Sequence, residues 1–158
     1  PSLGATVFLP EQDQGFASKD KLESQISTLY GGRVAEEIIF GSGKVTTGAQ
    51  NDIERATHIA RNMVINWGLS ERLGPISFSA SSFAGINGTT RLAENTASLI
   101  DEEIETLMRR NYERTVHLIR DHLAKLHAIA DALMKYETLG GSDIKKIVEV
   151  NHNRPLSF

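Results

Sequence analysis

The chain has 158 residues, no cysteine and a formal net charge of -3 at pH 7. This length suits one domain with a substantial core. The absence of cysteine excludes disulfides, thiolate metal sites and a thiol nucleophile. The acidic balance, without a basic run, gives no support for nucleic-acid binding. No apolar stretch approaches the ~20 residues of a membrane helix, and no signal peptide is visible.

The N-terminal residues predict one short strand. Residues 4–10 are rich in β-branched and aromatic residues and end at Pro10. No second convincing strand follows, so we expect an edge strand, or a strand whose partners lie outside this chain. The sequence begins at Pro1 rather than Met. This fits either a piece of a longer protein or a processed start.

A helix is predicted over residues 18–40, with Ser18 or Asp20 as its cap. Apolar residues keep one helical phase through this range: Leu22, Ile26, Leu29, Tyr30, Val34 and Ile38. The two glycines at 31–32 are therefore expected inside the helix, where another backbone or side chain approaches closely. For Glu36 and Glu37, the pattern alone favours solvated helix surface over a carboxylate that faces a site or an ion-pair partner.

The most informative helix begins near residue 50. Its apolar face is predicted from Ile53, Ala56, Ala60, Met63, Val64 and Trp67. Asn51 or Asp52 could be the N-cap. Alternatively, Thr47 and Gln50 form a capping box one turn earlier, which places Asp52 inside the helix and in need of a positive partner. A metal ion is one such partner, but the pattern alone favours a cap or a structural ion pair.

The second half of the chain is predicted to be almost entirely helical. Gly68 is a natural left-handed C-cap, and residues 76–91 read as a mobile surface loop with a weak hairpin at 87–88. One apolar stripe follows from about residue 93. A bend is expected near residues 120–122, with Asp121 capping a second helix. Residues 140–141 should end that helix, with Ser142 capping a last short one.

No complete catalytic set is present in the sequence. The five histidines do not form H-E-x-x-H, and His117, His122 and His127 are spaced so that they diverge around a helix, which favours surface positions. Neither a G-x-S-x-G elbow nor a phosphate-binding loop occurs. The predicted fold class is mainly α, a helical bundle with one short N-terminal edge strand.

Several motifs resemble one known family in the order in which they occur. The matching segments are residues 4–11, 29–37, 46–53, 60–64, 67–70, 111–112 and 132–139. They are similar to the peptidase domain of the FtsH family, which comprises membrane-anchored, ATP-dependent zinc metalloproteases with a AAA ATPase module ahead of the protease module. The resemblance covers nearly the whole chain. Residues 77–90 depart most from the family, because this loop looks shorter and less charged than its counterparts there.

The resemblance implies roles for particular residues. Asp52 becomes the third zinc ligand, while two histidine ligands and the general-base glutamate lie on an upstream H-E-x-x-H helix that is absent here. Glu36 and Glu37 would support the ligands or the structure rather than bind the metal. Two further sets of residues have implied roles. Thr47 and Gly48 let the loop pass close to the site, and Thr6, Val7 and Phe8 form a strand to which an extended substrate could add.

The implied function is part of an ATP-dependent zinc endopeptidase that degrades membrane and soluble proteins processively. The chain alone should be inactive, and ATP would bind a separate module. The family implies a hexamer, polypeptide substrates and membrane attachment only through the parent's anchor. This domain would lie on the cytoplasmic side, or on the matrix or stroma side in an organelle. Residues 1–91 would carry the zinc ligand and substrate strand, and residues 92–158 the C-terminal helices. The alternative is a non-catalytic helical oligomerisation module in which Asp52 is only a cap or ion-pair partner.

Overall fold

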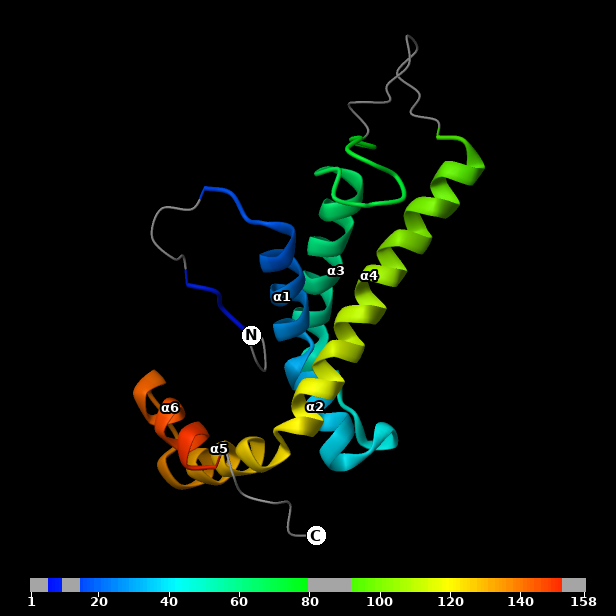
Figure 1. Ribbon diagram of the computed structural model, residues 1–158. Helices are drawn as coiled ribbons and strands as arrows, with labels where there is room; N and C mark the ends of the chain where they lie inside the picture. Colours follow the sequence, from blue (N-terminus) through cyan, green and yellow to red (C-terminus); the bar gives the residue numbers. More distant parts are fainter. Residues whose placement is uncertain (1–5, 10–14, 80–91, 152–158) are drawn as a thin grey trace. The chain divides into compact units, whose positions relative to one another are not determined.

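The computed structural model describes residues 6–9, 15–79 and 92–151, and these are predominantly helical (Figure 1). The prediction of a mainly α fold is confirmed. The chain divides into two compact units, residues 1–115 and 116–158, with the division inside one long helix. The functional division at residues 91 and 92 stays a prediction. None of the described helices is long and apolar enough to cross a membrane.

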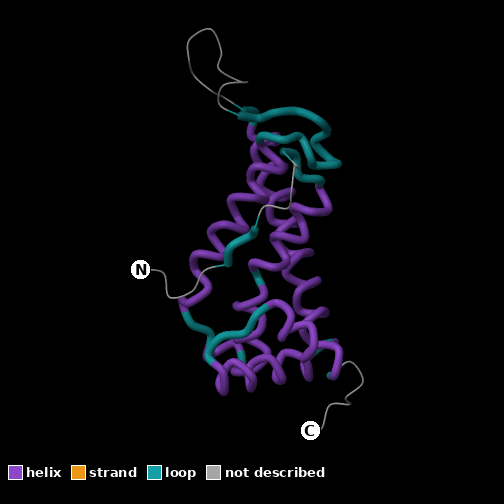
Figure 2. The backbone as a smooth tube through the Cα atoms, turned by 90° about the vertical axis from the view of Figure 1, so that its left-hand side faces the viewer, coloured by secondary structure: helices purple, strands orange, loops and turns teal. Residues whose placement is uncertain are grey.

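The short N-terminal strand is not formed within the described residues, which contain helices and loops only (Figure 2). Thr6–Leu9 have no regular secondary structure. A strand is defined by hydrogen bonds to a neighbouring strand, and the described part of the chain supplies no such neighbour. An edge strand paired within this chain is therefore not seen at residues 6–9. The alternative, a strand whose partners lie outside this chain, stays a prediction, and the remaining positions lie outside the described residues.

The first predicted helix is in fact two helices, α1 (Lys19–Leu29) and α2 (Gly31–Phe40). The Ser18 hydroxyl caps α1 by accepting from the Lys21 N–H at 3.2 Å. The break falls at Tyr30, and among the described residues no atom beyond the helix's own backbone and the adjacent residues lies within 4 Å of a Cβ placed on either glycine at 31–32. The expected close approach at these glycines is not seen within the described residues.

Helix α3 (Gln50–Ile65) follows two short 3₁₀ turns, Ser42–Lys44 and Thr47–Ala49. Its buried face consists of Ala56, Ala60, Met63 and Val64, as predicted. Trp67 lies beyond the end of the helix and is 50% exposed. Gly68 adopts φ +61°, as predicted for a left-handed residue, but the C-cap of α3 is Asn66, two residues earlier.

Helix α4 (Glu94–Asp121) packs against α1 through a buried polar network that the apolar pattern did not predict. The Ser27 hydroxyl donates to the Asn111 Oδ1 at 3.0 Å, and the Thr115 hydroxyl donates to the Ser27 carbonyl at 2.8 Å. Asn111 is only 2% exposed, and its amide also donates to the Leu107 carbonyl at 2.9 Å. Satisfied buried polar groups of this kind fix one helix register.

The start of the predicted mobile loop is held in the core. Phe78 is buried with Val64 and Ile100, and its N–H donates to the Ile65 carbonyl at 2.7 Å. The expectation of a surface loop is wrong at Phe78. Residues 80–91, including the predicted hairpin, lie outside the described residues.

The second unit contains the end of α4 and two further helices, α5 (Leu123–Tyr136) and α6 (Gly141–Val150), which contact one another. The predicted bend is present, but Asp121 is the last residue of α4 and His122 occupies the cap position of α5. Likewise Gly140, not Ser142, precedes α6, and the Asp143 carboxylate accepts from the Gly140 N–H at 3.0 Å.

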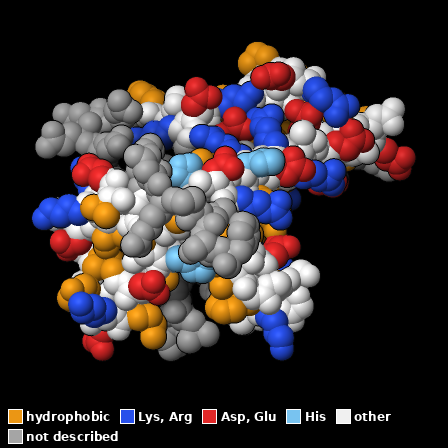
Figure 3. Space-filling view, turned by 60° about the horizontal axis from the view of Figure 1, so that its bottom comes forward, with side chains coloured by type: hydrophobic (Ala, Val, Ile, Leu, Met, Phe, Trp, Pro, Cys, Tyr) orange, Lys and Arg blue, Asp and Glu red, His pale blue; other side chains and the backbone are white. Residues whose placement is uncertain are grey.

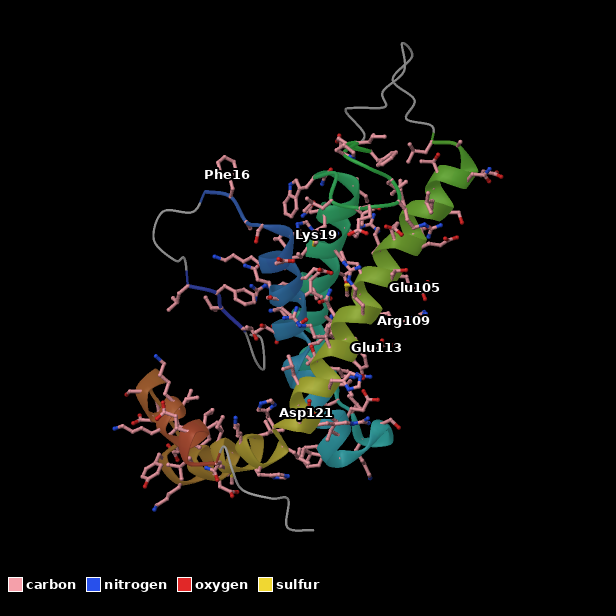
Figure 4. All side chains as sticks on the ribbon, viewed as in Figure 1. Phe16, Lys19, Glu105, Arg109, Glu113 and Asp121 are labelled. Atoms are coloured by element: carbon pink, nitrogen blue, oxygen red, sulfur yellow. The ribbon has the colours of Figure 1, made fainter. Side chains whose placement is uncertain are left out.

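The described surface mixes charges of both signs, as the face in Figure 3 shows. In Figure 4, Glu105, Arg109 and Glu113 follow one another along α4, and Arg109 pairs with Glu105 one turn away. His117, His122 and His127 are exposed, as the sequence predicted.

Candidate active site

Asp52 lies in the first turn of α3, inside the helix rather than at its cap. The N-cap position is Ala49, so Asn51 and Asp52 are excluded as caps. The predicted capping box is also absent, because the Gln50 amide donates to Glu54 at 2.9 Å instead. The helix dipole favours a negative charge in the first turn. Because Asp52 is not the cap, its carboxylate can bind partners outside its own helix.

The partner of Asp52 among the described residues is Thr6, 46 positions earlier in the chain. The Thr6 N–H donates to Asp52 Oδ1 at 3.4 Å, and the Thr6 hydroxyl donates to Oδ2 at 3.1 Å. Both residues are half-buried. Asp52 therefore joins α3 to the segment that the resemblance implies for substrate binding.

Arg55 holds the same segment from the next turn of α3. Its guanidinium donates to the Thr6 carbonyl and lies over the Phe8 ring, 5.6 Å from the ring centroid. A guanidinium in this position combines a charge-assisted hydrogen bond with a cation–π contact. Sequence reasoning missed Arg55. Its spacing from Asp52, three residues along a helix, was the available signal that both side chains share a face.

Exposure alternates along the N-terminal segment. Thr6 and Phe8 are half-buried against α3, whereas Val7 and Leu9 are 76% and 84% exposed. A period of two is the side-chain pattern of an extended chain with one covered face. The segment is thus laid along α3 in a strand-like alternation, although no second strand pairs with it in the described ranges.

Glu36 supports the loop that leads into α3. Its Oε1 accepts from the Thr46 hydroxyl at 2.6 Å, and its Oε2 accepts from the Thr46 N–H at 3.4 Å. The Thr46 hydroxyl in turn accepts from the Gly48 N–H at 3.2 Å. A Cβ on Gly48 would lie 3.3 Å from that hydroxyl, which is a tight contact. Thr47 is exposed in the same turn. Thr46, which sequence reasoning missed, is the residue that connects Glu36 to Gly48.

Glu37 is the neighbour of Glu36 but contacts α4 rather than the loop before α3. It accepts a hydrogen bond from the Tyr112 hydroxyl, and the Tyr112 ring meets Tyr30 edge-on with centroids 5.3 Å apart. Burial, followed by the hydrogen bond to the Glu37 carboxylate, raises the pKa of Tyr112 to about 12. Glu36 and Glu37 therefore serve separate contacts: one holds the loop before α3, and the other joins α2 to α4.

The described residues do not provide a complete metal site. No group of three or more His, Asp or Glu side chains lies close enough together among them to hold a metal ion, whereas a zinc site needs three or four protein ligands. Asp52 fits the part of one ligand, because a carboxylate offers about four acceptor positions and Thr6 uses two. Within the described ranges, Asp52 is therefore not joined by a set of further ligands.

The helical fold and the half-buried Asp52 carboxylate, which accepts from Thr6, fit part of a metallopeptidase domain. A model of peptidase family M41 matches residues 1–147. The chain therefore belongs to peptidase family M41, and the resemblance to the FtsH peptidase domain is confirmed.

Similar proteins carry names that agree with this family. The ATP-dependent zinc metalloprotease FtsH of Buchnera aphidicola subsp. Baizongia pistaciae is 47% identical over 153 residues, covering 94% of this chain and 25% of its own length. FtsH of Photobacterium profundum is 47% identical over 152 residues, covering 93% of this chain and 22% of its own. The ATP-dependent zinc metalloprotease YME1L of Drosophila melanogaster is 41% identical over 148 residues, with coverages of 94% and 20%. The chain thus spans a quarter or less of the length of these relatives.

Proposed function

We propose that this chain is part of an ATP-dependent zinc endopeptidase in which Asp52 is one of the zinc ligands. One observation carries the proposal: the Asp52 carboxylate faces away from its own helix and meets Thr6, in the segment expected to bind substrate. Zinc in such enzymes supplies an activated water for peptide hydrolysis. The two histidine ligands and the general-base glutamate would come from an H-E-x-x-H helix outside this sequence.

The chain's own residues would position the metal ligand and the substrate. Thr6, Val7 and Phe8 would accept an extended polypeptide by main-chain hydrogen bonds. Glu36 would hold the Thr46–Gly48 turn, and with it the start of α3, in place. Glu37 would act at a distance from the metal by fixing α2 against α4 through Tyr112.

The wider assembly belongs to the same proposal. The chain alone would be inactive, since one carboxylate is a poor zinc site. In the whole protein, a separate module would bind ATP and drive processive degradation of membrane and soluble proteins. The enzyme would be a hexamer attached to a membrane by an anchor outside this chain. This domain would lie on the cytoplasmic side, or on the matrix or stroma side in an organelle, without binding nucleic acid.

Replacing Asp52 in the complete enzyme tests the proposal. Asp52→Asn keeps the size of the side chain but removes its charge, so we expect loss of zinc, measured by elemental analysis per protomer, and loss of casein cleavage. Asp20→Asn is a matched control, because Asp20 also lies in the first turn of a helix and is exposed. Full zinc content and full activity in Asp52→Asn would overturn the proposal.

The second candidate is a helical assembly module, and the second unit favours it. No residue of α5 or α6 is buried. Their exposed apolar side chains are Leu133, Met134, Tyr136, Ile144 and Val150. Light scattering on Asp52→Ala separates the two functions. An intact oligomer without zinc supports the ligand role, whereas loss of the oligomer supports a purely structural Asp52.

A further inference from the structure

All three polar groups of Thr6 are engaged by side chains of α3. Its N–H and hydroxyl go to Asp52, and its carbonyl accepts from Arg55. In an extended chain, the N–H and the carbonyl of one residue point to the same edge, and those of the next residue point to the opposite edge. The main-chain edge that carries the Thr6 N–H and carbonyl is therefore hydrogen-bonded to α3.

The opposite edge belongs to Val7. Val7 is 76% exposed, and neither its N–H nor its carbonyl has a hydrogen-bond partner among the described residues. Main-chain groups without partners along an extended segment are a template for a further strand. By fixing Thr6, α3 determines which edge of the segment is left unpaired by the residues that the structure describes.

Arg55 fixes the orientation of the segment around Thr6 through two contacts. Its hydrogen bond to the Thr6 carbonyl sets the rotation of that peptide group, and its contact with the Phe8 ring fixes the residue two positions later. Asp52 alone holds the N–H and the hydroxyl of Thr6, but it does not contact the carbonyl or Phe8. Without Arg55, the segment could rotate beyond Thr6, and the Val7 edge would no longer be presented in one orientation.

We propose that Arg55 is a positioning residue for polypeptide substrate: it fixes Thr6 and Phe8 so that an extended substrate pairs with the Val7 edge. This inference rests on the proposed function and adds to it the residue that sets the pairing edge. The occupant is the main chain of an unfolded polypeptide, recognised through its peptide groups rather than through one side chain.

Steady-state cleavage of an unfolded protein by the complete enzyme tests the proposal. Arg55→Ala should raise KM about tenfold, because a charge-assisted hydrogen bond and a ring contact are lost, while kcat and zinc content stay near wild type. Arg55→Lys keeps a cation and a donor and should recover part of the change. Arg114→Ala serves as the control, because Arg114 is exposed on α4.

Peptide substrates with single N-methylated amides test the pairing itself. Methylation removes one donor, so in the wild-type enzyme we expect KM to rise at alternate positions of the peptide. In Arg55→Ala the same methylations should raise KM by a several-fold smaller factor, because the pairing is already weakened. Equal methylation effects in wild type and Arg55→Ala would overturn the role of Arg55.

Hydrogen exchange separates positioning from a general structural effect. Peptides covering Thr6–Leu9 should exchange faster in Arg55→Ala, whereas peptides from α1 and α4 should be unchanged. Unchanged exchange at Thr6–Leu9 together with unchanged KM overturns this inference alone. If Asp52→Asn also retains zinc and activity, the proposed function fails with it, so the two failures are distinguishable.

Discussion

Thr6 donates its N–H and its hydroxyl to the two carboxylate oxygens of Asp52, across 46 positions of the chain. This contact brings the N-terminal segment onto the first turn of α3. It also gives Asp52 partners that are neutral, so its negative charge is not neutralised by them. Thr6 therefore orients the carboxylate, whose charge would remain for the zinc ion that we propose it binds.

Replacing Thr6 tests this orientation. Thr6→Val keeps the shape but removes the hydroxyl donor, and we expect the zinc affinity of the complete enzyme to fall about tenfold, as is typical when a partner of a metal ligand is lost. Thr6→Ser retains the hydroxyl and should bind zinc like the wild type. Competition with a chromophoric chelator measures both. Identical affinities for the Val and Ser variants would contradict an orienting role.

The contact between Glu36 and Thr46 should be energetically coupled. Glu36→Gln and Thr46→Val should each lower the free energy of unfolding by about 1 kcal/mol, since each removes hydrogen bonds made by this pair. The double variant should cost less than the sum of the two single variants, because the second change finds the contact already lost. Urea unfolding of all four proteins measures the coupling. Strict additivity would show that the two residues act independently.

Tyr112 should stabilise the fold below pH 10 and lose this effect above it. Its pKa is raised from the ordinary 10 to about 12 by burial and by Glu37, so folding favours the protonated phenol. That contribution is fully present below pH 10 and disappears as the pH rises from 10 to 12. Tyr112→Phe should therefore be less stable than wild type at pH 7, by about 1 kcal/mol for the lost hydrogen bond.

Urea unfolding at pH 7, 10 and 11 checks this expectation, with Tyr136→Phe as control because Tyr136 is 60% exposed. The stability difference between wild type and Tyr112→Phe should shrink with pH, and that of the control should be small throughout. A difference for Tyr112→Phe that stays constant across this range would contradict the raised pKa.

Replacing two glycines with positive φ should lower the stability of the fold by different amounts. Gly68 has φ +61°, and a Cβ there would lie 2.9 Å from the Pro75 Cα. Gly74 has φ +74°, with open space around its Cβ position. Gly74→Ala should cost about 1 kcal/mol for the backbone conformation alone. Gly68→Ala should cost more, because backbone must also shift. Thermal unfolding of both variants compares them, and equal losses of stability would rule out the close approach to Pro75.

Local patterns in the sequence predicted most of the helices and their buried faces. Ile26, Val34 and Ala60 follow helical spacing, and all three are buried in the structure. The caps were less predictable. Ser142 and Asp121 are good cap residues by type, yet Gly140 and His122 occupy those positions. Cap positions depend on where the preceding turn ends, which tertiary contacts decide.

The long-range contacts of the candidate site could not be predicted from local patterns. Asp52 was identified as a carboxylate that needs a partner, but nothing in the sequence alone pairs it with Thr6. Arg55 and Thr46 were missed because their partners, Thr6 and Glu36, are 49 and 10 positions away. Buried Asn111 was missed because an apolar pattern does not register a polar residue that is satisfied inside the core.

The position of zinc in the complete enzyme is the most direct test of the role proposed for Asp52. An anomalous difference map at the zinc edge should place the ion about 2.0–2.2 Å from an Asp52 carboxylate oxygen, with Thr6 still donating to that carboxylate. Zinc bound elsewhere, with Asp52 bonded only to Thr6, would contradict the account.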